Sequence, residues 1–324
     1  MTLIRLILSF IVACGLVLVT MPKFIPYLHK LKFGQVEREE GLASHKAKGG
    51  TPTMGGLIFL VASVIAVYLC NISFVVNPYV NLITFIVIGF GAIGFLDDYL
   101  IVVRKNNEGL KPLYKYGLQS AMAILFYILA KIFIPDFTTV ITIPLAHTSF
   151  DLGWFYPVFV YFMFTAESNA VNLSDGLDGL ATGLVMVATA PFVIFALMSK
   201  NTAVAIYGMA MIGGLLAFMY FNYHPARIFM GDCGSLSLGA FLAVMAIFSK
   251  QELLLIVVGI VPLIETLSVI IQVVSFKTRK KRVFKMAPIH HHFEMCGWSE
   301  SQVVVTFWFV GFIAGILGIL LGVM

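Results

Sequence analysis

Long runs of apolar residues, separated by short polar segments, dominate the chain. A helix that crosses the hydrocarbon core of a bilayer needs about 20 consecutive apolar residues. Ten runs approach that length and predict membrane-spanning helices at roughly 3–21, 54–70, 79–96, 117–134, 154–171, 177–198, 203–221, 236–249, 252–276 and 302–323. The fifth run contains Glu167 and the eighth is short, so these two are the least regular. The pattern predicts an all-α integral membrane protein with a single polytopic domain over residues 1–324.

Composition supports this class. Of the 324 residues, 60% are hydrophobic and 11% are charged, whereas soluble domains contain about 25% charged residues. A soluble globular protein, collagen, a coiled coil and a disordered chain are therefore excluded. The net charge of +5 is better explained by basic residues beside membrane spans than by nucleic-acid binding, which we do not expect. The four cysteines show no CxxC spacing, so neither a disulfide nor a zinc site is implied.

The basic residues predict how the spans are oriented. Numbered from the N-terminus, the odd connections between spans hold seventeen of the 21 Lys and Arg residues. Cytoplasmic connections carry the excess of Lys and Arg in membrane proteins. The odd connections are therefore predicted to be cytoplasmic and both termini to lie outside.

The polar segments that look least like simple connectors all fall on this predicted cytoplasmic side. They cover residues 45–56, 97–98, 169–179, 222–235 and 288–294. Structural polar residues would have no reason to choose one side. The distribution therefore predicts one composite site at the cytoplasmic face.

Asp97 and Asp98 close the third predicted span. Adjacent carboxylates repel each other, and a helix C-terminus disfavours negative charge, so the pair gains most from a bound cation. Mg²⁺ prefers one or two carboxylates together with substrate phosphates and water. The structural alternative is a solvated acidic cap.

Two further carboxylates, Asp175 and Asp178, lie between the fifth and sixth spans. If Asp175 opens the sixth helix, their spacing places both on one face of its first turn. They would then either cap that helix or face a ligand. The nearby Asn169 and Asn172 amides suit a nucleobase or a sugar.

The segment 229–235, Phe-Met-Gly-Asp-Cys-Gly-Ser, precedes the eighth span. Its glycines allow close approach of the backbone to a ligand, and Gly-rich backbone at a helix N-terminus is a phosphate site in physical terms. Asp232 adds a carboxylate, and Ser235 is a candidate helix cap. Cys233 lacks a catalytic partner in the sequence and is interpreted as a small space-filling residue.

The run His290, His291 and His292 lies in the basic ninth connection. Three consecutive histidines cannot point the same way on a helix, so anion binding is favoured over zinc. The Gly-rich segment 46–56 lacks the GxxxxGK[ST] pattern, and ATP hydrolysis is not indicated. Glu265, inside a span, is either a functional carboxylate or a helix-packing group.

Taken together and in order along the chain, the segments 50–56, 95–99, 172–180, 230–232 and 288–294 closely resemble the phospho-N-acetylmuramoyl-pentapeptide transferase family. The Thr-Pro-Thr-Met-Gly-Gly entry and the histidine run separate it from sister transferases that use UDP-GlcNAc. The sequence departs from the family at Cys233 and at Ser174, where threonine is usual.

The resemblance implies transfer of phospho-MurNAc-pentapeptide from its UDP carrier to undecaprenyl phosphate, giving lipid I and UMP with Mg²⁺. It implies a multi-pass protein of the bacterial inner (plasma) membrane and a homodimer. Catalytic roles then fall to Asp97, Asp98, Asp232 and His290, with Asp98 and Asp232 as metal ligands. Substrate contacts fall to Lys48, Thr53, Asn172, Asp175, Asp178, Phe229, His291 and His292.

Two alternatives stay open at this point. The nearer is a sister transferase that uses UDP-GlcNAc as donor. The more distant is a transporter with Glu167 and Glu265 as ion sites, although transporters place such groups near the midplane in related repeats. The sequence does not decide between direct transfer and a covalent enzyme intermediate.

Overall fold

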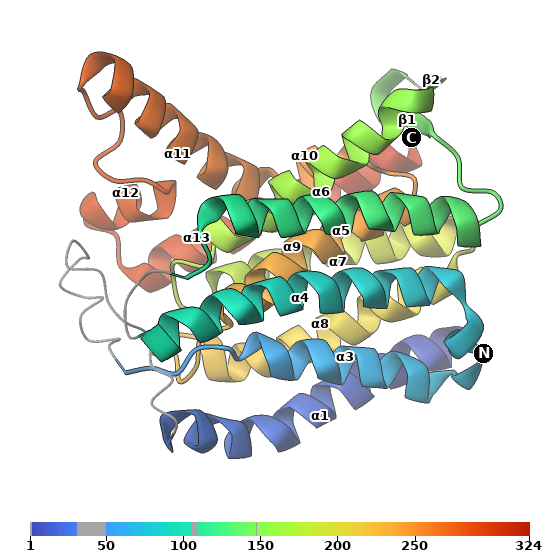
Figure 1. The fold of residues 1–324 in the computed structure, drawn as a ribbon, viewed down its shortest axis with the longest axis horizontal. Coiled ribbons are helices and arrows are strands. Elements are labelled where there is room, and N and C mark those ends of the chain that lie inside the picture. The colour runs from blue at the N-terminus through green and yellow to red at the C-terminus, as the bar shows by residue number, and fades with distance from the viewer. Residues whose placement is uncertain (1, 31–49, 105–108, 147) are drawn as a thin grey trace.

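The computed structural model describes residues 2–30, 50–104, 109–146 and 148–324. The chain folds almost entirely into helices that run side by side in one bundle (Figure 1). The long helices are α1 (Thr2–Lys30), α3 (Gly56–Cys70), α4 (Pro78–Arg104), α5 (Pro112–Phe133), α6 (Tyr156–Leu173), α7 (Leu180–Met198), α8 (Thr202–Asn222), α9 (Gly231–Phe248), α11 (Ile260–Arg279) and α13 (Glu300–Val323).

Short elements complete the fold. They are α10 (Leu254–Val258), α12 (Ile289–Met295) and the 3-10 turns η1 (Ile72–Val76), η2 (Pro144–Ala146) and η3 (Gly153–Phe155). Strands β1 (Val140–Ile143) and β2 (Thr148–Asp151) form an antiparallel hairpin with Val140 opposite Asp151.

Helix α9 is the centre of the bundle. Every residue from Cys233 to Phe248 is buried, and α9 packs against α4, α6 and α7. Small residues let the neighbouring backbones approach closely, as is common where membrane helices pack. A side chain at Gly239, for example, would collide with the backbone of Glu167 in α6.

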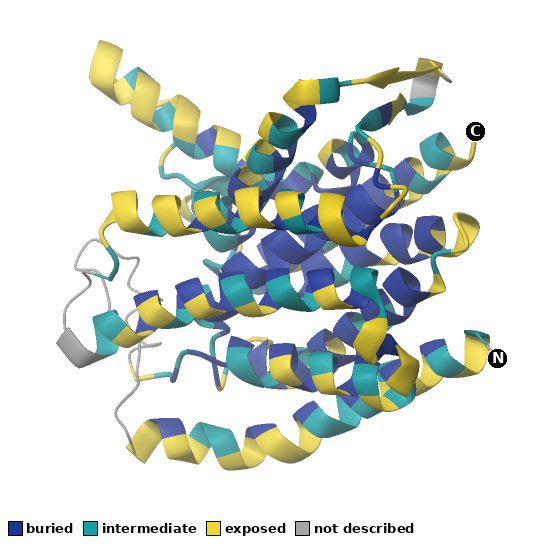
Figure 2. Cartoon of the chain, turned by 45° about the vertical axis from the view of Figure 1, so that its right-hand side comes forward, coloured by how far each residue is buried: buried dark blue, intermediate teal, exposed yellow. Residues whose placement is uncertain are grey.

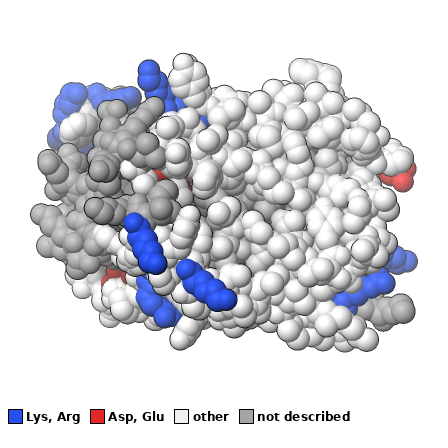
Figure 3. All heavy atoms as spheres, turned by 60° about the horizontal axis from the view of Figure 1, so that its bottom comes forward, with Lys and Arg blue, Asp and Glu red and all other residues white. Residues whose placement is uncertain are grey.

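The outer helices carry exposed apolar side chains, whereas the buried residues lie inside the bundle (Figure 2). On the face seen in Figure 3, a band without Lys, Arg, Asp or Glu separates charged groups at the two ends. Eight helices in the described part of the chain are long and apolar enough to cross a membrane. The predicted fold class, an all-α integral membrane protein, is therefore confirmed.

Each predicted span coincides with helical structure, but the boundaries differ. Helix α3 has only 15 residues, and α6 is not among the eight. The ninth predicted span is two helices, because the chain changes direction at Gly259 between α10 and α11. Beyond this point α11 leans away from the bundle (Figure 1). The count of ten spans and their orientation stay predictions.

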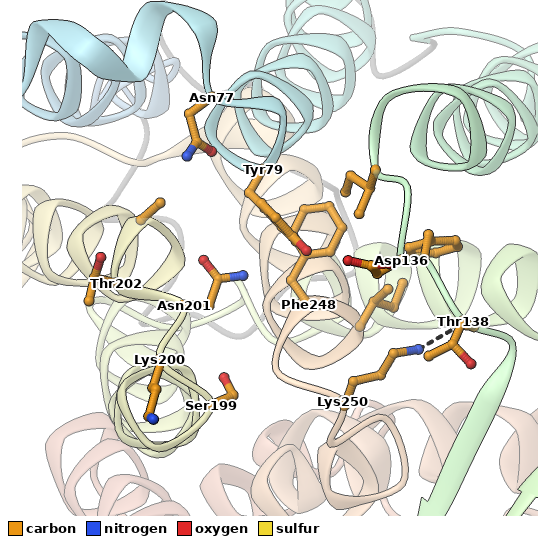
Figure 4. A pocket seen from close by; sticks show the side chains of 14 residues that line it. Asn77, Tyr79, Asp136, Thr138, Ser199, Lys200, Asn201, Thr202, Phe248 and Lys250 are labelled. Carbon is orange, nitrogen blue, oxygen red and sulfur yellow. Dashed lines mark hydrogen bonds between the residues drawn. The ribbon is translucent and has the colours of Figure 1, made fainter.

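A cavity of about 470 Å³ opens at one end of the bundle, between the start of α4, the end of α5 and the end of α9. Figure 4 shows the side chains of Tyr79, Asp136 and Asn201 converging there. The Lys250 ammonium donates to the Thr138 carbonyl at 2.7 Å, and burial lowers the pKa of Lys250 from its ordinary value. The sequence motifs lie at the opposite ends of these same helices.

Candidate active site

Asp98 on α4 is hydrogen-bonded to the start of α9. Its carboxylate accepts hydrogen bonds from the backbone N–H groups of Asp232 and Cys233, both at 3.1 Å. The first N–H groups of a helix have no intrahelical partner, and a carboxylate there also matches the helix dipole. Asp97 and Asp98 were predicted to lie at a helix C-terminus. This is wrong, because α4 continues to Arg104. The Asp98 side chain is held by a neighbouring helix instead of being a solvated cap.

Asp97, Asp98 and Asp232 form a cluster of three carboxylates with the ammonium group of Lys115. Lys115 Nζ contacts Asp232 Oδ2 and lies 3.7 Å from Asp97 Oδ2. Asp97 Oδ1 also accepts from the Leu110 N–H at 2.8 Å. Both Asp97 and Asp98 are only 6% exposed. Buried carboxylates this close together require positive charge, which Lys115 supplies in part.

Asn172, at the end of α6, extends this carboxylate cluster. Its side-chain amide donates to Asp232 Oδ1 at 2.7 Å and to Ser235 Oγ at 2.9 Å. Ser235, a candidate cap for this helix, does not cap α9, because α9 begins four residues earlier at Gly231. Its hydroxyl donates to the Gly231 carbonyl within the helix. Asn172 therefore holds the Asp232 carboxylate from α6.

The entry segment before α3 pairs with the loop before α9. The Phe229 N–H donates to the Pro52 carbonyl, and the Gly55 N–H donates back to the Phe229 carbonyl, both at 2.8 Å. This pairing brings the Thr53 hydroxyl and the Asp98 carboxylate to the same side of Gly231. Two segments about 175 residues apart in sequence thus share one wall of the site. Lys48 lies outside the described residues.

Gly231 cannot be replaced without strain. Its φ is +70°, a conformation that L side chains rarely adopt. A side chain would also collide with Asp98 and Thr53. This glycine allows α9 to begin directly against the carboxylate of α4.

The turn between α6 and α7 carries Asp175, Gly176 and Asp178. Asp175 does not open the next helix, which was one possibility from the sequence, because α7 begins at Leu180 after a left-handed Gly179. Both aspartates therefore lie in the turn rather than on a helical face. Asp175 is half-buried, and Asp178 is 2% exposed.

Asp178 contacts His224 and Glu300, and we call these three residues the clamp. Asp178 Oδ2 lies 3.0 Å from His224 Nδ1 and accepts the Ala226 N–H at the same distance. Glu300 Oε1 accepts the Asp178 N–H at 2.7 Å. The side chains offer ligand atoms within 4.8 Å of one another, a spacing that a metal ion could use. Their mutual hydrogen bonds already explain the arrangement, so we interpret the clamp as structural support for the turn.

The three histidines diverge, as expected for consecutive positions on a helix. His290 is buried and pairs with Glu265 of α11 at 3.0 Å between Nδ1 and Oε2. His291 Nδ1 lies 2.8 Å from Glu294 Oε2. His292 Nδ1 accepts the Lys285 N–H at 3.1 Å. The His290 ring points toward the α6–α7 turn, where it meets Gly176.

Comparison with known proteins identifies the family. The glycosyl transferase family 4 model matches residues 80–250, and a phospho-N-acetylmuramoyl-pentapeptide-transferase signature matches residues 48–60. Proteins named phospho-N-acetylmuramoyl-pentapeptide-transferase from Bacillus thuringiensis (strain Al Hakam) and Bacillus cereus (strain AH187) are 52% identical over 303 residues, 93% of each chain. The chain belongs to the phospho-N-acetylmuramoyl-pentapeptide transferase family. The sequence resemblance is confirmed.

The carboxylate cluster, the clamp and the buried histidine all have a contact at or beside the α6–α7 turn. Asn172 at the end of α6 contacts the carboxylate cluster. In the turn that follows, Asp178 belongs to the clamp and Gly176 meets the buried His290. Sequence reasoning missed Lys115, His224 and Glu300. Each is an isolated polar residue in a connection or at a helix start, without a motif to mark it. Their basic or acidic character was the only signal available.

His224→Ala tests the clamp. A hydrogen bond to a charged group contributes about 1.5–3 kcal/mol, so loosening the turn is expected to raise KM for a nucleotide donor about tenfold. The turnover number should change less, because the carboxylate cluster is not touched. Steady-state kinetics of the purified variant measure both. His29→Ala, another exposed histidine, is the matched control, and an unchanged KM would show that the clamp does not support binding.

Proposed function

We propose that the chain transfers phospho-MurNAc-pentapeptide from UDP-MurNAc-pentapeptide to undecaprenyl phosphate, forming lipid I and releasing UMP. The observation that carries this proposal is the 52% identity over 93% of the chain to relatives named for that transferase. The cluster of three carboxylates with Lys115, at one end of an apolar bundle, is the chemistry that such a reaction needs.

The membrane setting matches the two substrates. The donor is a water-soluble nucleotide, whereas the acceptor is a lipid whose phosphate lies at the membrane surface. A site at one end of the helices serves both. Seventeen of 21 basic residues fall in the odd connections, and on this basis we place the site at the cytoplasmic face of the plasma membrane, with ten spans and both termini outside. The homodimer is proposed from family resemblance alone.

The carboxylate cluster has the donor set that a divalent cation requires. Two of the three carboxylates, Asp97 and Asp232, contact a single ammonium group, and Mg²⁺ prefers oxygen ligands of this kind. Asp98 and Asp232 would hold the ion. When bound, Mg²⁺ would neutralise charge on the diphosphate that is broken and on the one that is made.

The residues of the chain would then position the reacting groups. Asp97 would orient or deprotonate the acceptor phosphate, and Lys115 would stabilise negative charge beside it. Asn172, with two hydrogen bonds to the α9 start, would keep Asp232 aimed at the diphosphate. Exchange of one diphosphate bond for another depends mainly on such positioning and charge neutralisation.

The remaining family positions would bind the nucleotide. Lys48, Thr53, Asn172, Asp175 and Asp178 would line its pocket, Phe229 would stack on uracil, and His290, His291 and His292 would contact the sugar or diphosphate. We propose that the acceptor phosphate attacks directly, because it is already an adequate nucleophile. Isolation of a phosphosugar–enzyme adduct would contradict this step.

Release of UMP by the purified protein in detergent tests the proposed function. We expect release from UDP-MurNAc-pentapeptide only when undecaprenyl phosphate and Mg²⁺ are both present. UDP-GlcNAc, offered as a competing donor, is expected to give no product. Release from UDP-GlcNAc alone would assign the chain to the sister activity. Flux in sealed vesicles without any product would instead support a transporter.

A further inference from the structure

Glu265 and His290 form a buried pair, and the proposed roles do not use Glu265. Glu265 lies on α11 and His290 on α12, and both are fully buried with 0% exposure. Glu265 Oε2 and His290 Nδ1 are 3.0 Å apart. Within the described residues, the second atom of each group, Glu265 Oε1 and His290 Nε2, is buried without a hydrogen-bond partner.

The free nitrogen of His290 faces the α6–α7 turn. A side chain added at Gly176 would collide with His290 Nε2 and Cε1, so the imidazole edge lies directly against this glycine. Gly176 follows Asp175 and stands two residues before Asp178. The side-chain nitrogen of His290 that has no hydrogen-bond partner among the described residues is therefore aimed at the turn that carries two of the predicted donor-binding residues.

A carboxylate hydrogen-bonded to one ring nitrogen of a histidine determines whether the other ring nitrogen carries a proton. The hydrogen bond at Nδ1 determines which nitrogen carries the proton, as in the carboxylate–histidine pairs that orient metal ligands. With the Nδ1 proton donated to Glu265, Nε2 presents a lone pair. An unpartnered buried nitrogen costs free energy and calls for an explanation, of which a missing ligand is one.

We propose that Glu265 is a positioning residue: it holds the His290 proton on Nδ1, so that Nε2 accepts a hydrogen bond from a hydroxyl or amide N–H of the sugar-nucleotide donor. The proposal rests on the proposed function for the identity of the donor. The pair also links α11, which leans away from the bundle, to the turn beside the carboxylate cluster.

Histidine tautomers give a test that does not depend on activity. Protein labelled with ¹⁵N-histidine gives imidazole signals by NMR, and His290→Gln identifies the signal of His290 by its loss. We expect the Nδ1–H tautomer in the unmodified chain and a mixture, or the Nε2–H form, in Glu265→Gln. An Nε2–H tautomer or a doubly protonated ring in the unmodified chain would overturn the proposal.

Kinetics separate positioning from simple packing. Loss of a second-layer partner typically costs 10- to 100-fold, and we expect Glu265→Gln to lower UMP release by this factor. In the His290→Gln background the same change should have no further effect. Additive losses in the double variant would show that Glu265 acts independently of His290 and would overturn the proposal.

Glu167→Gln is the matched control. Glu167 is a second glutamate inside the bundle, on α6, with a buried and unpartnered Oε1, and its removal should leave release within about twofold. An equal loss in this variant would mean that any buried glutamate matters for packing, and would also count against the proposal. If the unmodified chain released no UMP, the proposed function would fail while the tautomer measurement still decided the pairing.

Discussion

Asp232→Asn is expected to lower UMP release by about 10³-fold, as loss of one preorganised group that stabilises transition-state charge does elsewhere. Asp232 contacts Lys115, accepts a hydrogen bond from Asn172 and lies in the first turn of the central helix α9. The amide keeps the shape of the side chain but removes its negative charge, so a metal would lose a ligand while the helix stays in place. Release assays across a range of Mg²⁺ concentrations measure the effect.

Asp136→Asn provides the control for this substitution. Asp136 is exposed and lines the cavity at the other end of the bundle. The same chemical change there should leave release within about twofold. Similar losses in both variants, or full activity in Asp232→Asn, would contradict the assignment of the site to the carboxylate cluster.

Lys115→Met is expected to have opposite effects on catalysis and on metal binding. Without the ammonium group, Asp97 and Asp232 lose their cation, so UMP release should fall about 10²-fold. Attraction of Mg²⁺ to the cluster should increase, because a neighbouring positive charge is gone, and a unit charge at this range changes affinity by about tenfold or more. The thermal shift that Mg²⁺ produces in the detergent-solubilised protein measures this affinity.

The metal dependence of stability completes that test. In the presence of a chelator, Lys115→Met should unfold at a lower temperature than the unmodified chain, since buried carboxylates would remain unneutralised. Added Mg²⁺ should recover more of the loss than it adds to the unmodified chain. An equal Mg²⁺ shift in both proteins would place the metal away from Lys115.

Hydropathy predicted the helical architecture well because the membrane imposes it. The backbone must satisfy its hydrogen bonds within each segment, so apolar runs become helices. The break at Gly259 was missed because α10 and α11 are both apolar and read as one continuous hydrophobic run. The end of α4 was also misplaced, since polar Asp97 and Asp98 look like a terminus, whereas Asp98 is hydrogen-bonded to the start of α9 and Asp97 to the Leu110 N–H.

The site residues that belong to sequence motifs were predicted, whereas isolated residues outside any motif were missed. Asp97, Asp98 and Asp232 were expected together because their segments share one face, and the structure brings them together. Lys115 was counted only as a basic connector residue. Its contact with Asp232 depends on how α5 begins beside α9, which no local pattern encodes. The same holds for Glu300, whose partner Asp178 lies more than a hundred residues away.

Pulsed EPR with Mn²⁺ in place of Mg²⁺ tests most directly the claim that this cluster holds the metal against a diphosphate. With UDP-MurNAc-pentapeptide bound, the claim predicts hyperfine coupling between the metal and ³¹P in the unmodified chain and in Asp136→Asn. The coupling should be lost in Asp232→Asn. Coupling that survives in Asp232→Asn, or bound metal without any ³¹P coupling, would contradict the account.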